Sequence, residues 1–198
     1  MAYSEQFNVL WFNPIRSATR STLEIQRFLK FTDFGTHDEP NENQKEFYFV
    51  SNIRNPYSRM VSIFYFLFRN ENRDIETFRL FVKKKVWEEQ NLKNPPNLQL
   101  NLKKIFDKFG KRPDYLIKTE NIYDDIFNLP FLQEKSNPDF LKLMDEKIKT
   151  NNFFQEYGKK PHWKEHYDED TANILYEYLE KDFILGNYDK NSWKDGSS

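Results

Sequence analysis

Arginine is the rarer basic residue in this chain, with nine arginines against 21 lysines, yet four of the nine fall in two short segments. The segments cover residues 14–22 and 54–62, and each lies between an apolar run and a run with helical spacing. A guanidinium can hold phosphate or sulfate through two parallel hydrogen bonds, which a lysine ammonium cannot imitate. The sequence therefore predicts two anion-binding turns. The plainer alternative is two surface arginine clusters at helix starts.

The first segment mixes arginines with small hydroxyl residues, in the order Pro14-Ile15-Arg16-Ser17-Ala18-Thr19-Arg20-Ser21-Thr22. Ser21 has the spacing of a helix N-cap that forms a capping box with Glu24. Backbone N–H groups, hydroxyls and the helix dipole would together cradle an anion at such a turn. The pattern GxxxxGK[ST] is absent, which excludes the usual nucleotide-binding P-loop.

The second segment reads Arg54-Asn55-Pro56-Tyr57-Ser58-Arg59-Met60-Val61-Ser62. Arg54 follows an apolar run, and the carboxyl end of a strand is where α/β folds place ligands. Pro56 suits the first turn of a helix. Ser62 would then lie on the second turn of that helix and could face the same anion as Arg54.

Three apolar runs predict strands over residues 7–12, 46–53 and 114–119. Residues 35–45 are all turn and polar types and are expected to form a loop. One expected helix begins at Ser21, and the others cover residues 56–68, 74–86, 98–109, 139–149 and 171–182. Strands that alternate with helices indicate an α/β fold with a small, mostly parallel sheet flanked by helices.

The 198 residues are expected to form a single domain, 1–198, with core volume supplied by 20 Phe, 11 Tyr and 4 Trp. The absence of cysteine excludes disulfide scaffolds, Cys-ligated zinc, iron–sulfur clusters and thiol nucleophiles. A net charge of −1 without a basic stripe argues against a nucleic-acid partner. No run reaches the roughly 18 apolar residues of a membrane span, and the first residues lack a signal-peptide pattern. We therefore expect a cytoplasmic protein with no membrane span.

The second segment resembles the 3′-phosphate motif of sulfotransferases that use 3′-phosphoadenosine 5′-phosphosulfate (PAPS). Its sequence is most similar to that of the carbohydrate (Golgi-type) branch. Arg16-Ser17-Ala18-Thr19 is similar to the family's 5′-phosphosulfate loop. Further similarities follow in the family's order and extend the resemblance from about Asn8 to Tyr188: Asp114 to Asn121, Gly158-Lys159-Lys160-Pro161, and Tyr167 to Phe183 with Gly186-Asn187-Tyr188.

The resemblance implies a P-loop-like sulfotransferase fold and transfer of a sulfuryl group from PAPS to a hydroxyl acceptor, without a metal. Arg16 would stabilise charge at the leaving phosphate, and the rest of the loop would bind the donor: Ser17, Ala18, Thr19, Arg20 and Ser21. Arg54 and Ser62 would hold the 3′-phosphate, with Lys159 or Lys160 closing over it. The acceptor implied is a sugar or glycan, while tyrosine and small-molecule acceptors stay open.

The general base that the resemblance implies is His37, in the loop before the second strand, because imidazole titrates near neutral pH. Asp38 and Glu39 are rivals, since some relatives use a carboxylate, and the alternative for His37 is an ordinary solvated loop histidine. Glu120 is expected to be a structural partner of the loop arginines, with catalysis as its alternative role.

Two residues depart from the family pattern. Ala18 stands where glycine is common, so the loop must manage with negative φ there or bend differently. Arg20 replaces a small hydroxyl residue, and either adds a charge to the phosphosulfate site or points away.

Two other functions remain open on the sequence. The first is a non-catalytic module that binds PAPS or its product, adenosine 3′,5′-bisphosphate (PAP). The second is a zinc metalloprotease, because His162-Trp163-Lys164-Glu165-His166 matches H-x-x-E-H. That motif follows Gly158 and Pro161 in a stretch without apolar periodicity, where a helix carrying both histidines on one face is not expected.

Overall fold

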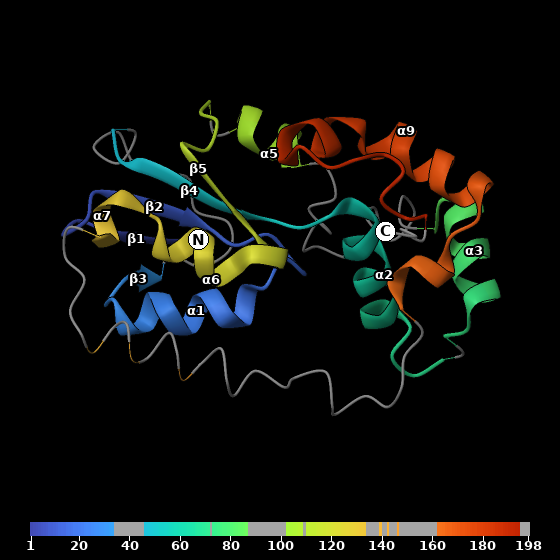
Figure 1. The fold of residues 1–198 in the computed structure, drawn as a ribbon, viewed down its shortest axis with the longest axis horizontal. Coiled ribbons are helices and arrows are strands. Elements are labelled where there is room, and N and C mark those ends of the chain that lie inside the picture. The colour runs from blue at the N-terminus through green and yellow to red at the C-terminus, as the bar shows by residue number, and fades with distance from the viewer. Residues whose placement is uncertain are drawn as a thin grey trace.

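The computed structural model describes residues 1–33, 46–71, 73–86, 102–108, 110–133 and 162–194, with single positions at 139, 142 and 146. Among these residues the fold is a five-stranded sheet with helices packed on both faces and a helical layer beyond one end of the sheet (Figure 1). None of the described helices combines the length and the apolar character that a bilayer crossing requires.

The sheet has the strand order β3-β1-β2-β4-β5. The three strands predicted from apolar runs are confirmed as β2 (Val9–Phe12), β4 (Tyr48–Ile53) and β5 (Tyr115–Lys118), and they pair in parallel. Each apolar run is slightly longer than its strand, because residues such as Phe7 already belong to the adjoining turn.

The prediction of a mostly parallel sheet is wrong, because two further strands make the sheet mixed. β1 (Ala2–Ser4) pairs antiparallel with β2, and β3 (Thr32–Asp33) pairs antiparallel with β1. The turn between β1 and β2 is closed by the N–H of Asn8, which donates to the carbonyl of Glu5 at 3.3 Å. Such a short connection can join only antiparallel neighbours. Strands of three and two residues are also too short to show an apolar pattern.

Alternate residues of the central strands face two different cores, as the period of two in a strand requires. Val9 and Trp11 of β2 face α1 (Thr19–Phe28), α6 (Ile122–Phe127) and α7 (Pro130–Gln133). Leu10 and Phe12 face α5 (Leu102–Lys108) and the end of α9 (Glu169–Gly186). The sheet is therefore buried on both faces, and α1 connects β2 to β3 on one of them.

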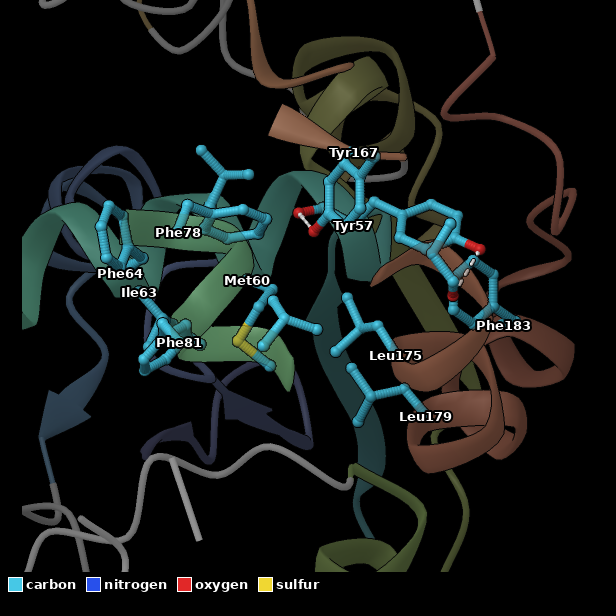
Figure 2. Close-up of a cluster of buried hydrophobic side chains, with 13 residues drawn as sticks. Tyr57, Met60, Ile63, Phe64, Phe78, Phe81, Tyr167, Leu175, Leu179 and Phe183 are labelled. Carbon is cyan, nitrogen blue, oxygen red and sulfur yellow. Dashed lines mark hydrogen bonds between the residues drawn. The ribbon is translucent and has the colours of Figure 1, made fainter. Parts of the chain in front are cut away.

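A third core joins α2 (Pro56–Leu67), α3 (Ile75–Lys83) and α9, and it is rich in aromatic side chains (Figure 2). Tyr57 packs edge-on against Tyr167 and Phe183, with both ring centroids 4.8 Å away. The hydroxyl of Tyr167 donates to the Tyr57 carbonyl at 2.8 Å. This core anchors the first turn of α2, the helix that carries the second predicted anion-binding segment.

The helix predictions hold within a few residues for α2, α3, α5 and α9. Asp74 is the N-cap residue of α3, and Asp168 is the N-cap residue of α9. The start of α1 differs: the helix begins at Thr19, so the prediction of Ser21 as N-cap is wrong. The predicted helix 139–149 lies, apart from three single positions, outside the described residues.

Candidate functional site

The two arginine-bearing segments meet at one edge of the sheet, where the parallel strands β2, β4 and β5 end. Phe12 lies opposite Ser51, and Ile53 lies opposite Lys118, so the three carboxyl ends are neighbours. The chain leaves β2 into residues 13–18, β4 into Arg54 and Asn55, and β5 into the short 3₁₀ helix η2 (Thr119–Asn121). The carboxyl edge of parallel strands is the usual ligand site of α/β folds.

The loop before α1 is held in a tight, partly left-handed turn. The N–H of Ser17 and the hydroxyl of Thr19 both donate to the Pro14 carbonyl, at 3.2 and 2.9 Å. Arg16 and Ala18 have φ angles of 64° and 54°. Ala18 therefore adopts the backbone conformation that glycine favours, so the first of the two alternatives, a negative φ at this position, is wrong. A left-handed residue other than glycine costs about 1–2 kcal/mol.

Ser17 is the member of this loop whose side chain is left without a partner. Its residue is fully buried, and its Oγ has no hydrogen-bond partner among the described residues. Leaving a buried hydroxyl unpaired costs roughly 1–3 kcal/mol. A buried hydroxyl of this kind calls for an explanation, and a bound anion or an ordered water would each supply the partner.

A buried polar network fixes the loop to the sheet. Asn52 of β4 accepts from the indole N–H of Trp11 at 3.0 Å and donates through Nδ2 to the Ser17 carbonyl at 2.9 Å. The same Nδ2 lies 3.0 Å from Oγ1 of Thr22 and 3.2 Å from Oδ1 of Asn13. We did not predict this network, although an amide inside a mostly apolar strand is the sequence signal that could have found Asn52.

Arg54 and Arg16 each donate a hydrogen bond to the other segment. Nη1 of Arg54 donates to the carbonyl of Arg16 at 3.3 Å, and its Nε donates to Ser58 Oγ at 2.9 Å. Nε of Arg16 donates to Ser62 Oγ at 3.0 Å, across 46 positions of sequence. Arg16, Arg54 and Ser62, which the sequence predicts as ligand contacts, thus lie together.

The electrostatics of this corner favour an anion. Burial lowers the pKa of Arg54, the carboxylate of Glu120 opposes that shift, and the nearby charge of Arg16 adds to it. A guanidinium still remains protonated at neutral pH. Two cations therefore lie near one carboxylate, Glu120, in a partly buried corner, and an anion bound beside them would relieve the repulsion that remains.

Glu120 binds the backbone beside Arg54. Its Oε1 accepts from the N–H of Asn55 at 2.9 Å, and its Oε2 accepts from the hydroxyl of Tyr188 at 2.9 Å. Asn55 in turn caps α2, with its side-chain oxygen accepting from the N–H of Tyr57 at 3.0 Å. Glu120 therefore supports the start of α2, and its charge acts on Arg54 at the same time.

Arg59 of the second segment has a structural role. It is 3% exposed; its Nε donates to the Ile15 carbonyl at 3.1 Å, and its Nη1 lies 3.8 Å from Oδ2 of Asp182. Burial lowers the pKa of Arg59 to about 10, and Asp182 opposes the shift. Asp182 also accepts from the N–H of Leu102 at 2.9 Å, at the start of α5. Arg59 thus supports the anion loop from behind rather than facing a ligand.

Several predicted site residues fall outside the described residues: His37, Asp38, Glu39, Lys159 and Lys160. The backbone of Arg20 belongs to α1, but its side chain lies outside the described part. Ser21 lies in the first turn of α1.

The H-x-x-E-H motif forms the short 3₁₀ helix η4 (Trp163–His166). His162 caps it: the N–H of His162 donates to Glu165 Oε1 at 2.8 Å, and the His162 side chain accepts from the N–H of Lys164. His166 is fully buried, with one ring nitrogen 3.2 Å from the Tyr65 hydroxyl. His162 and Glu165 thus cap a short helix, and His166 packs in the core. This arrangement does not fit the zinc alternative.

No family model, curated protein or solved structure matches this chain. The chemistry of the carboxyl edge of β2, β4 and β5 is therefore the basis for a functional proposal.

Proposed function

We propose that this protein is a sulfotransferase that moves a sulfuryl group from PAPS to a hydroxyl acceptor, with a sugar or glycan as the favoured class. The observation that carries the proposal is the contact of Arg16 with Ser62, supported by the contact of Arg54 with the Arg16 carbonyl. A donor with phosphate groups at both ends of one nucleoside needs two anion-binding segments side by side, and these contacts join the two segments that we predict to bind anions.

In the proposed reaction the acceptor oxygen attacks the sulfur of PAPS. An oxygen–sulfur bond forms, the bond from sulfur to the 5′-phosphate oxygen breaks, and PAP leaves with the electron pair. The acceptor proton passes to a base, for which His37 is the candidate, with Asp38 and Glu39 as rivals. As in phosphoryl transfer, catalysis consists mainly of positioning and of stabilising spread negative charge.

Residues of both segments would bind the phosphate groups of PAPS. The loop after β2 offers the N-terminus of α1, the Arg16 guanidinium and the unpaired Ser17 hydroxyl to a 5′-phosphosulfate. Arg54 and Ser62 would hold the 3′-phosphate. Lys159 or Lys160 would close over it, and a P-loop-like fold around β2 and α1 is part of the same proposal.

A thermal-shift experiment tests the donor without knowledge of the acceptor. At a hundredfold excess over its dissociation constant, PAP should stabilise the protein by about 2.7 kcal/mol, a rise in Tm of roughly 5–11 °C for a chain of this size. AMP lacks the 3′-phosphate and should shift Tm much less at the same concentration. Equal shifts from AMP and PAP would contradict the 3′-phosphate site.

Labelled PAPS then separates an enzyme from a module that only binds the nucleotide. A sulfotransferase releases PAP and transfers the label to an acceptor, whereas a binding module leaves PAPS intact. Addition of EDTA should leave Tm and turnover unchanged, because the proposed chemistry uses no metal.

A further inference from the structure

Phe66 is a large apolar side chain left open to solvent beside the candidate site. It is 48% exposed, whereas Ile63 and Phe64 on the same helix are fully buried. It lies on α2 one turn after Ser62, so both side chains fall on one side of the helix. The aromatic core of α2 does not include Phe66.

The ring of Phe66 contacts the same arginine that contacts Ser62. The guanidinium carbon of Arg16 lies 5.4 Å from the centroid of the Phe66 ring, within the range of a cation–π contact. Nε of Arg16 points to Ser62 Oγ at 3.0 Å. A half-exposed aromatic surface thus borders the cation that the proposed function places at the 5′-phosphosulfate.

A hydroxyl-bearing ring matches this combination of groups. Its flat face can pack on an aromatic side chain, while its hydroxyls can accept hydrogen bonds from a guanidinium. An acceptor held in this way would keep its reacting oxygen near the anion loop, and such positioning is a large part of catalysis by an enzyme of this kind.

We propose that Phe66 is the acceptor-positioning residue of this protein and that the acceptor is a hydroxyl-bearing ring, either a sugar or a phenol. This inference rests on the proposed sulfuryl transfer. In that step the ring hydroxyl forms the new oxygen–sulfur bond, loses its proton to the base and displaces PAP. Phe66 itself forms no bond and acts through packing.

Two acceptor probes and two matched variants test the inference. Chitotriose represents a sugar ring and 4-nitrophenol a phenol ring, each assayed for label transferred from PAPS. Phe66→Leu removes the aromatic face, Phe66→Tyr retains it, and Phe127→Leu makes the same change at a 46%-exposed residue at the end of α6. PAP affinity is measured for every protein by calorimetry.

Phe66→Leu should raise KM for the accepted probe by about tenfold and change PAP affinity less than threefold. Phe66→Tyr should restore KM, and Phe127→Leu should leave both quantities unchanged. An equal loss in Phe66→Leu and Phe127→Leu, or a loss of PAP affinity as large as the rise in KM, would overturn the role of Phe66.

The wild-type protein separates this inference from the proposed function. If it binds PAP but sulfates neither probe, the ring acceptor is wrong while the donor site stands. If it does not bind PAP, the proposed sulfotransferase function is wrong, and the role of Phe66 fails with it. Transfer to only one probe identifies the ring as sugar or phenol and supports the inference.

Discussion

Nε of Arg16 donates a hydrogen bond of 3.0 Å to Oγ of Ser62, although the two residues are 46 positions apart. Arg16 belongs to the loop between β2 and α1, and Ser62 to the second turn of α2. The contact therefore joins the two segments that the sequence singles out for anion binding, and it makes each of them sensitive to changes in the other.

Arg54→Ala should weaken PAP binding by about tenfold or more, because a hydrogen bond to a charged group contributes about 1.5–3 kcal/mol. Calorimetric titration with PAP measures the change. Arg27→Ala is the matched control, since Arg27 is an exposed arginine in the last turn of α1, at the opposite end of that helix from the loop. Unchanged PAP affinity in a folded Arg54→Ala protein would contradict the assignment of the second segment.

His37→Ala should lower kcat by about 10²–10⁴-fold and leave PAP affinity intact, because a general base acts on the acceptor proton and not on the donor. Single-turnover transfer of label from PAPS measures the first quantity and calorimetry the second. Near-normal kcat would transfer the role of base to Asp38 or Glu39, whose alanine variants complete the series.

Ala18→Gly should raise the free energy of unfolding by about 1 kcal/mol. Relief of the left-handed strain gives about 1–2 kcal/mol, and the greater freedom of glycine in the unfolded chain offsets about 0.4–1 kcal/mol of it. The same change at Ala172, a buried position within α9, should instead destabilise the protein by about 1 kcal/mol or more. Urea unfolding of both variants checks the opposite signs, and a destabilising Ala18→Gly would show that the loop is not strained.

Asn52→Leu should lower the free energy of unfolding by roughly 1–3 kcal/mol, because it leaves the Trp11 indole N–H and the Ser17 carbonyl without their partner. PAP affinity should fall as well, since the loop loses its attachment to β4. Ser51→Ala, at the adjacent buried residue, removes one hydroxyl that donates to a carbonyl and should leave PAP affinity unchanged. Normal PAP affinity in Asn52→Leu would mean that the loop keeps its shape without the network.

The pH dependence of stability should carry a contribution from Asp182. Burial raises the pKa of Asp182 to about 6, although the Arg59 guanidinium and the backbone N–H groups at the start of α5 oppose the shift. The pKa of an aspartate in the unfolded chain is about 3.9, so the folded state binds the proton more tightly. The resulting stabilisation is complete below pH ~4 and is lost as the pH rises through ~6.

Asp182→Asn removes this titration and keeps an oxygen that can accept from the Leu102 N–H. The difference in unfolding free energy between wild type and Asp182→Asn should therefore change between pH 4 and 6, with the wild type losing stability relative to the variant, by up to about 3 kcal/mol. Denaturant unfolding at several pH values measures it. A difference that is flat across this range would show that Asp182 is ionised throughout.

Local signals in the sequence were sufficient for the elements that carry the candidate site. Runs dominated by apolar residues predicted β2, β4 and β5, because a strand buried on both faces needs apolar residues at most positions. Ser51 and Asn52 of β4 are the buried polar exceptions. Pro56 marked the start of α2, since its fixed φ and missing N–H suit the first turn of a helix. The pairing of arginine with small hydroxyl residues after two of these runs then located the Arg16 and Arg54 segments.

Tertiary structure alone decided which side chains of those segments lie at the site and which are buried behind it. Arg54 and Arg59 look alike in sequence, yet Arg54 lies at the strand end beside Arg16 while the helix turns Arg59 inward onto Ile15 and Asp182. The Asn52 network likewise depends on Trp11 and Ser17, which are distant in the chain. Such partners are chosen by packing and by the need to satisfy buried polar groups, which no local pattern encodes.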